Sequence, residues 1–241
     1  MIGLLGKKIG MTQFFSQDGK VIPVIVIEGG PCLVIQVKNR ERDGYIAVQM
    51  GYHKGKRNLN RPMRGHFKKT NSEPTRYLRE FRVADTAGIE TGQQLTVEQF
   101  KIGDFVDVSG KTKGKGFQGG VKRWGWRGGG GAHGSMQHRK PGSIGSNTTP
   151  GRVFRGHHLP GHTGDVRRTI QNLRVLQINS AENLLVVHGS VPGAMNGLLE
   201  IHPAVKRKAI SKVKESQMAK ETVKKAKKEL GSKESKKETK K

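Results

Sequence analysis

The chain has 241 residues, and its 45 Lys and Arg against 19 Asp and Glu give a net charge of +26. Self-repulsion of this size opposes compaction, so the composition indicates a polyanionic partner. The single cysteine, Cys32, excludes a disulfide framework and a cysteine-based zinc site, and it suits a reducing cytoplasm. The opening residues place Lys7 and Lys8 where a signal peptide needs apolar residues. No apolar run approaches the ~20 residues of a membrane helix, so we expect a cytoplasmic protein.

The charge is distributed unevenly along the chain. Residues 111–168 contain 12 basic residues and one acidic residue, and residues 206–241 contain 15 basic and 5 acidic residues. The rest of the chain has 18 basic and 13 acidic residues, which is an ordinary balance. The sequence therefore predicts a near-neutral body with two basic appendages.

The body has the pattern of a β protein. Short β-branched or alternating runs end at turn residues such as Asp18-Gly19 and Asp43-Gly44, which favour tight hairpins because they tolerate positive φ. Many short strands with turns between them are typical of an antiparallel barrel. We expect a mainly β fold, with a barrel body over 1–110 and 165–205 and a small mixed subdomain at about 58–100. The predicted strands are 21–27, 32–37, 45–50, 105–108, 173–178, 183–189 and 197–201.

The carboxyl-terminal segment, 206–241, is a basic tail. It is rich in Lys, Glu and Ala, which form helices well, up to Gly231, a residue that suits a helix end. Its apolar residues are poorly spaced, so we expect a helix only where a partner holds it. A solvated, disordered end is the alternative.

The central segment, 111–164, is the unusual part of the sequence. No Asp or Glu occurs from residue 108 to residue 164, and residues 111–168 contain 16 glycines but only scattered apolar residues. Such a stretch cannot offset its ordering entropy by burying apolar surface. A solvated linker has no reason to exclude carboxylates, whereas a segment that lies against phosphates has one. We therefore predict an extended, irregular arm that binds nucleic acid.

Several fragments of the arm imitate enzyme signatures. Residues 114–119 match the glycine spacing of a dinucleotide-binding turn, but the apolar helix and the acidic residue that must follow are missing. Gly110-Lys111-Thr112 resembles the end of a phosphate-binding loop, yet Phe105 stands where that loop needs glycine. A metal site would need further ligands beside the histidines of this segment, but no cysteine lies nearby and Asp165 is the one carboxylate. The five histidines are His133, His138, His157, His158 and His162. We therefore expect no enzyme, no cofactor and no metal site.

The remaining chemistry of the arm is that of nucleic-acid binding. Arg and Lys neutralise phosphates, Gly lets two backbones approach, and Trp or His rings stack on bases. For Trp124 and Trp126, core packing at the root of the arm is an equal alternative. The candidate RNA-binding residues are Lys7, Lys8, Lys111, Lys113, Lys115, Lys122, Arg123, Trp124, Trp126, Arg127, His133, His138, Arg139, Lys140, Ser146, Asn147, Thr148, Arg152, Arg155, His157, His158, His162, Arg167 and Arg168.

The choice between RNA and DNA depends on architecture. The sequence shows no helix-turn-helix, zinc finger or basic zipper, the usual DNA-reading modules. A long irregular arm suits the crevices of a folded RNA instead. An architectural DNA-binding protein is the alternative, and a nucleotide-dependent enzyme is a third hypothesis.

Four stretches resemble one known family, the universal large-subunit ribosomal protein three in its bacterial form. They are "MIGLLGKKIGMTQFF", "FKIGDFVDVSGKTKGKGFQGGVKRWGW", "AHGSMQHRKPGSIGSNTTPGRVFRGHHLPGHTG" and "NLLVVHGSVPGAMNGLLEIHPAVK". The resemblance covers roughly residues 1–206 in collinear order, and the basic tail departs from the compact bacterial pattern. It implies a translation-protein type of β-barrel that docks on the large ribosomal RNA.

The resemblance also implies a place and a role for the arm. The arm runs to near the peptidyl transferase centre without doing chemistry there, and the protein binds early in subunit assembly. Its neighbours are the large-subunit proteins numbered fourteen and nineteen. Some bacterial members carry a methylated glutamine directly after an asparagine near the tip of the arm. Here Thr148 follows Asn147, so we do not expect that modification.

Overall fold

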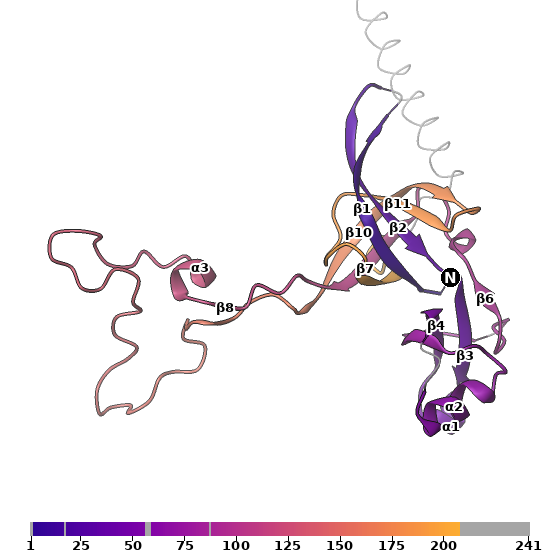
Figure 1. The fold of residues 1–241 in the computed structure, drawn as a ribbon, viewed down its shortest axis with the longest axis horizontal. Coiled ribbons are helices and arrows are strands. Elements are labelled where there is room, and N and C mark those ends of the chain that lie inside the picture. Colours follow the sequence, from indigo (N-terminus) through magenta and orange to yellow (C-terminus); the bar gives the residue numbers. More distant parts are fainter. Residues whose placement is uncertain (1, 17, 56–58, 87, 208–241) are drawn as a thin grey trace, which may run out of the picture.

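The body is a closed barrel of six antiparallel strands, as the sequence predicts. The computed structural model describes residues 2–16, 18–55, 59–86 and 88–207. Figure 1 shows the ring. Its strand order is β1-β12-β7-β10-β11-β2. β-bulges in β1 and at two places in β10 supply the local bends that closure requires. The six strands are β1 (Leu4–Phe15), β2 (Val21–Gly29), β7 (Phe105–Lys111), β10 (Arg167–Asn179), β11 (Leu184–His188) and β12 (Leu198–Pro203).

A second, four-stranded antiparallel sheet lies beside the barrel, with the order β5-β4-β3-β6. This side sheet starts at Cys32, well before residue 58, so the predicted strands 32–37 and 45–50 belong to it and not to the barrel. Sequence could not separate the two sheets, because strands of both have the same alternating pattern. The elements of this region are β3 (Cys32–Lys38), α1 (Arg40–Asp43), β4 (Ala47–Lys54), α2 (Arg61–Lys68), β5 (Thr75–Arg82), β6 (Gln94–Leu95) and the 3-10 helix η1 (Val97–Gln99).

The barrel and the side sheet share one hydrophobic core. Leu5 of β1 is fully buried, and its carbonyl accepts hydrogen bonds from Cys32 Sγ at 3.4 Å and from the Gly30 backbone N–H at 3.1 Å. A Cβ on Gly3 would lie only 2.2 Å from the ring of Phe81 in β5. Only glycine at position 3 therefore lets the ring pack this closely against the backbone just before β1. Burial raises the pKa of the Cys32 thiol to about 12, so the thiol packs as a neutral apolar group. The two sheets therefore form one body.

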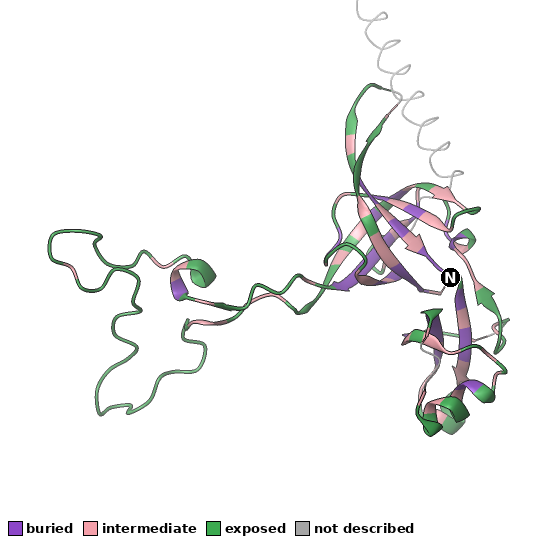
Figure 2. Cartoon of the chain, viewed as in Figure 1, coloured by how far each residue is buried: buried purple, intermediate pink, exposed green. Residues whose placement is uncertain are grey.

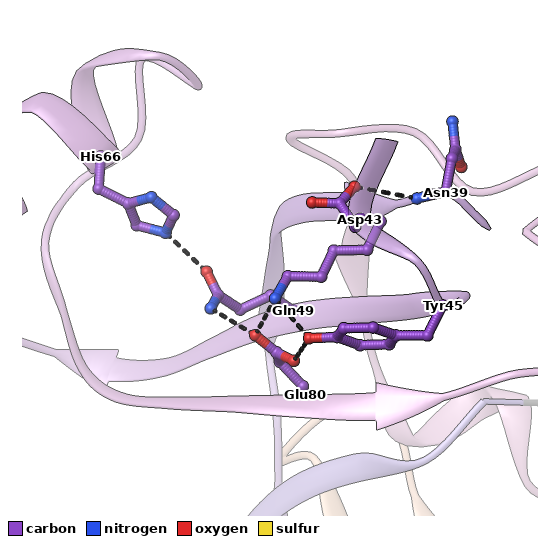
Figure 3. Close-up of polar contacts among 7 residues, drawn as sticks. Asn39, Asp43, Tyr45, Gln49, His66 and Glu80 are labelled. Carbon is purple, nitrogen blue, oxygen red and sulfur yellow. Dashed lines mark hydrogen bonds and ion pairs between the residues drawn. The ribbon is translucent and has the colours of Figure 1, made fainter. Parts of the chain in front are cut away.

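A polar cluster ties together the strands of the side sheet and α2. The Glu80 carboxylate forms an ion pair with Lys38 Nζ at 2.7 Å. It also accepts hydrogen bonds from the Tyr45 hydroxyl at 2.7 Å and from Gln49 Nε2 at 3.3 Å (Figure 3). His66 Nε2 of α2 lies 2.6 Å from Gln49 Oε1. The hydrogen bond from Lys38 lowers the pKa of Glu80, and the hydrogen bond to Glu80 raises the pKa of Lys38. The cluster thus stabilises the ionised forms of both groups and fixes α2 to β4.

Replacing Glu80 by Gln tests this cluster. Glu80→Gln should lower the free energy of unfolding by about 1 kcal/mol at pH 7, because it weakens a charge-assisted hydrogen bond. Since the pKa of Glu80 is lowered in the folded protein, its contribution is present above the ordinary glutamate pKa and is lost as the pH falls below it. Urea denaturation of both proteins at pH 7 and at about pH 3 measures the difference, which should shrink in acid.

A matched control is available at an exposed ion pair. Glu73 lies 2.9 Å from Lys54 Nζ, and the two side chains are 75% and 77% exposed. Glu73→Gln should change the free energy of unfolding by less than about 0.5 kcal/mol at either pH. Equal losses for Glu80→Gln and Glu73→Gln, or a Glu80→Gln loss that is unchanged in acid, would contradict the role given to Glu80.

Candidate nucleic-acid interface

The arm leaves the barrel and returns to it on two strands that pair with each other. Lys111 at the end of β7 lies opposite Arg167 at the start of β10. Directly beyond them, the Thr112 backbone N–H donates to the Val166 carbonyl at 2.9 Å. Both ends of the arm are therefore held side by side by the barrel ladder (Figure 1).

The ladder continues outward as a narrow ribbon. The short strands β8 (Phe117–Gln118) and β9 (Gly161–His162) pair with each other, and the Lys115 N–H donates to the Thr163 carbonyl at 2.9 Å. Gly164 has a φ of +76°, and a Cβ there would lie 2.2 Å from the Lys113 carbonyl oxygen. Only glycine permits this approach. The root of the arm is thus more regular than the irregular extension that sequence predicts.

Ion pairs within the chain hold the arm at the barrel. Lys111 Nζ lies 2.9 Å from Asp165, the acidic residue of the return strand. Arg167 and Arg79 both donate to the Glu200 carboxylate, whose side chain is 16% exposed; the Arg79 Nε distance is 3.0 Å. Lys111 and Arg167, two candidate RNA-binding residues, therefore already have carboxylate partners in the chain.

The next part of the arm is a small packed knot around α3 (Gly120–Trp124). The Trp124 ring stacks on His158, with centroids 4.1 Å apart and planes 6° apart. Trp124 Nε1 and Arg123 Nη1 both donate to the Leu159 carbonyl, at 2.9 and 2.8 Å. One face of Trp124 thus packs within the arm, as the core-packing alternative proposes, although the side chain keeps 42% of its surface exposed.

Trp126 lies against the same helix and borders a hollow. A Cβ on Gly120 would come within 1.9 Å of the Trp126 ring, so the ring rests directly on the glycine backbone. The hollow has a volume of about 630 Å³, which lies within the size range of small-ligand pockets. It has no acidic residue in its lining, which consists of Trp126, Gly128, Gly129, Gln137, Lys140, Pro141, Gly142, Ser143, Gly156, His157 and His158.

Beyond the knot, the arm is almost completely exposed. From residue 127 to residue 159 every residue except Ser135 is exposed (Figure 2). A first loop is closed by the Gly129 N–H, which donates to the His138 carbonyl at 3.0 Å. A second loop follows, in which Gly142 and Gly151 have positive φ on either side of residues 143–149. This distal part confirms the predicted long irregular extension.

The structure separates the candidate residues into two groups. Lys8 Nζ donates to the carbonyls of Val191 and Gly193 at 3.0 and 3.3 Å, and partial burial, with a smaller effect of Lys113, lowers the pKa of Lys8. Lys7 lies 4.0 Å from Glu28. These two lysines therefore make their contacts on the barrel. The candidates that are exposed on the arm and its return strand, in addition to those already described, are Lys113, Lys115, Lys122, Arg127, His133, Arg139, Lys140, Ser146, Asn147, Thr148, Arg152, Arg155, His157, His162 and Arg168.

Sequence reasoning missed the residues that position the arm. Glu200 pairs with Arg79 across 121 positions of sequence, so no local pattern announces it. The Leu159 carbonyl, which receives two side-chain donors, is a backbone group and has no sequence signal at all. Gly120 had at most a weak signal, because it follows Gly119 directly in a segment that is rich in glycine throughout.

Other kinds of site find no support in the described part of the chain. Within residues 2–16, 18–55, 59–86 and 88–207, no three His, Cys, Asp or Glu side chains are grouped to hold a metal ion. His158 stacks on Trp124, and His138 Nδ1 lies 2.8 Å from the Gly130 carbonyl. No described helix combines the length and apolar character needed to span a membrane. The predicted tail, 206–241, lies outside the described residues from position 208 onward.

Comparison with known proteins gives one consistent family. The family model for ribosomal protein L3 matches residues 75–184. The chain is 52% identical over 207 residues to the large ribosomal subunit protein uL3 of Carboxydothermus hydrogenoformans, covering 86% of this chain and 99% of that protein. It is 48% identical over 209 residues to the protein of the same name from Brachyspira pilosicoli, covering 86% and 96%. The corresponding protein of Geobacter metallireducens is 49% identical over 205 residues, covering 85% and 98%.

Two adjacent glycines test the knot at α3. Gly120→Ala places a methyl group where the Trp126 ring stands, so the ring must move and become more accessible to water. Gly119→Ala is the matched control, because a Cβ there meets nothing within 4 Å and its φ is −67°. Acrylamide quenching of tryptophan fluorescence should increase for Gly120→Ala and stay at the wild-type level for Gly119→Ala. Unchanged quenching in Gly120→Ala would show that Trp126 does not pack on this glycine.

Proposed function

The chain belongs to the uL3 family of large ribosomal subunit proteins, and we propose that it binds large-subunit ribosomal RNA and threads its arm between RNA segments. As a member of this family it is a structural component of the ribosome, a ribonucleoprotein that carries out translation. The ribosome is cytoplasmic in bacteria, and the partners of the chain are ribosomal RNA and other ribosomal proteins.

The observation that carries the RNA-binding proposal is the exposed, acid-free arm with both ends fixed. From residue 127 to residue 159 the arm buries almost none of its own surface and carries basic residues without any carboxylate. A folded RNA supplies both the packing atoms and the negative charge that this segment lacks. The hollow beside Trp126 offers an aromatic ring, a lysine side chain and no carboxylate in its lining, and such a lining suits an unstacked base.

The geometry of the arm also supports a role early in assembly. Because both ends of the arm are joined to the barrel through β7 and β10, the arm enters a crevice as a closed loop. A loop of this kind can be placed between RNA segments before they close around it, and later entry would require them to open again. We therefore propose that the protein binds the RNA early and that the RNA folds around the arm.

We further propose that the arm extends toward the peptidyl transferase centre and that the body contacts the large-subunit proteins numbered fourteen and nineteen. Both proposals rest on the family resemblance. The outer part of the β1–β2 hairpin supports a protein neighbour, because Met11, Phe15 and Val21 are 62%, 62% and 57% exposed there. Exposed apolar side chains on a protruding two-stranded ribbon suit a protein surface better than phosphates.

The RNA-binding proposal is tested by removing two exposed cations that follow the second loop. Arg152→Gln/Arg155→Gln should reduce the slope of log affinity against log salt concentration by about two, because each cation that contacts a phosphate releases about one counterion. Filter binding of large-subunit RNA between 50 and 200 mM salt measures this slope. Arg40→Gln/Arg42→Gln on α1 is the control with the same loss of charge, and it should keep the wild-type slope.

The competing interpretation as a DNA-binding protein is tested in the same assay. The wild-type chain should prefer large-subunit RNA to a DNA duplex of equal charge, and the arm variant should lose most of that preference. Equal slopes for the arm variant, the control and the wild type would contradict binding through the arm, and a preference for DNA would favour the alternative.

The position of the second loop is tested by Asn147→Asp. The Asn147 side chain is exposed, and no hydrogen bond joins it to any other described residue, so the change should leave the fold and the subunit yield unaltered. A new carboxylate near RNA that lines the peptidyl transferase centre should change the affinity of drugs bound there several-fold, which corresponds to about 1 kcal/mol. Reconstituted ribosomes and a panel of peptidyl-transferase inhibitors measure the effect. Asn39→Asp on the side sheet is the control, and wild-type drug sensitivity in Asn147→Asp would refute this placement.

A further inference from the structure

Helix α2 on the side sheet has two chemically different faces. Phe67 is 2% exposed and His66 contacts Gln49 of β4, so one face packs on the sheet. Arg61, Arg64 and Lys68 are all exposed. Their spacing of three and four residues places them on the same side of the helix, in a row about 10 Å long.

The sequence on either side of this row carries only positive charge. Residues 45–72 include no Asp or Glu, and residues 53–69 contain seven Lys and Arg. Among the described residues, no ion pair involves Arg61, Arg64 or Lys68. Charge composition does not reveal this cluster, because the 58–100 region as a whole has several acidic residues and a near-neutral balance.

Helix α1 on the same sheet shows that the pattern is specific to α2. Its four residues, Arg40–Asp43, alternate basic and acidic side chains, so its surface is neutral. A face that only had to stay soluble would carry such a mixture, whereas unbalanced cations repel one another and lower stability unless a polyanion is present. The row on α2 therefore indicates an anionic partner.

We propose that the outer face of α2 is a second RNA-binding surface, which holds the phosphate backbone of an RNA segment distinct from the one around the arm. The inference rests on the proposed function, because it takes ribosomal RNA as the partner. The side sheet and the arm lie on different sides of the barrel, so the two surfaces face different parts of the RNA (Figure 1).

The residues on this face favour RNA over an acidic protein. The guanidinium groups of Arg61 and Arg64 match the geometry of phosphate oxygens and can bind them in pairs. A protein interface needs a desolvated apolar or aromatic anchor, and lysine is depleted at such interfaces. The row offers no such anchor, because Met63 is half-buried and Phe67 is buried beneath the helix.

The matched pair of variants is Arg61→Gln/Arg64→Gln on α2 and Arg40→Gln/Arg42→Gln on α1. Each removes two exposed arginines, and Gln keeps the helix propensity. With the full chain and large-subunit RNA at 150 mM salt, the α2 variant should bind about tenfold more weakly and should lose about two from its salt slope. The α1 variant should match the wild type. Thermal melting of both variants checks that the side sheet remains folded.

Hydroxyl-radical footprinting of the same RNA separates this surface from the arm. The α2 variant should lose a set of protected nucleotides that Arg152→Gln/Arg155→Gln retains, and the reverse should hold for the arm variant. If the α2 variant keeps every protection and its affinity while the arm variant loses its own, the inference fails and the proposed function stands. If neither variant changes the footprint, both fail.

A crosslink provides a second readout, and the substitution that it requires removes no more than one charge. A photoreactive side chain at position 64 of the full chain should attach to RNA in assembled large subunits. Attachment to a protein instead of RNA would overturn the proposal and identify α2 as a protein-docking surface. The same reactive group at position 42 on α1 is the control, and it should give little RNA adduct.

Discussion

The pairing of β7 with β10 is the constraint on which the rest of the structure depends. This ladder closes the barrel between β12 and β11, and it buries Val106, Val108 and Leu173 in the core. The same ladder brings residues 111 and 167 together, so the two ends of a segment without a core of its own start from fixed positions. Because both ends are fixed, the free arm has fewer conformations available, so less conformational entropy is lost when the arm becomes ordered on a partner. The barrel thus serves as the rigid base of an otherwise unsupported arm.

Much of the fold could be predicted from the sequence, because its strands carry strong local signals. Every predicted strand is present, and the absence of acids from 108 to 164 correctly marked the extension. The division into barrel and side sheet could not be predicted, since it depends on long-range contacts such as that between Leu5 and Cys32. Strands β8 and β9 have two residues each, too few for any periodic pattern, and they exist only because the ladder at their base aligns them.

The candidate site was predictable as a segment but not residue by residue. Composition identifies which stretch carries unbalanced positive charge, yet it cannot tell which cations have partners inside the chain. Lys8 binds backbone carbonyls of the body, whereas Lys111 and Arg167 bind carboxylates where the arm joins the barrel. Charge balance averaged over a long window also hid α2, whose acid-free stretch ends just before Glu73. Pairing and sidedness are properties of the fold, so they appear only when the helices and strands are placed.

The two basic surfaces, α2 and the arm, differ in how much of the chain must become ordered on binding. Helix α2 is held by Phe67 and by the hydrogen bond from His66 to Gln49, so an RNA backbone can meet it without much loss of chain entropy. The arm must order more than thirty exposed residues, from 127 to 159, before it gains its full contacts. A rigid surface that binds first raises the effective concentration of the flexible one near its own site. If the chain binds RNA through both surfaces as proposed, α2 and the barrel position the protein first, and the arm becomes ordered as the RNA closes around it.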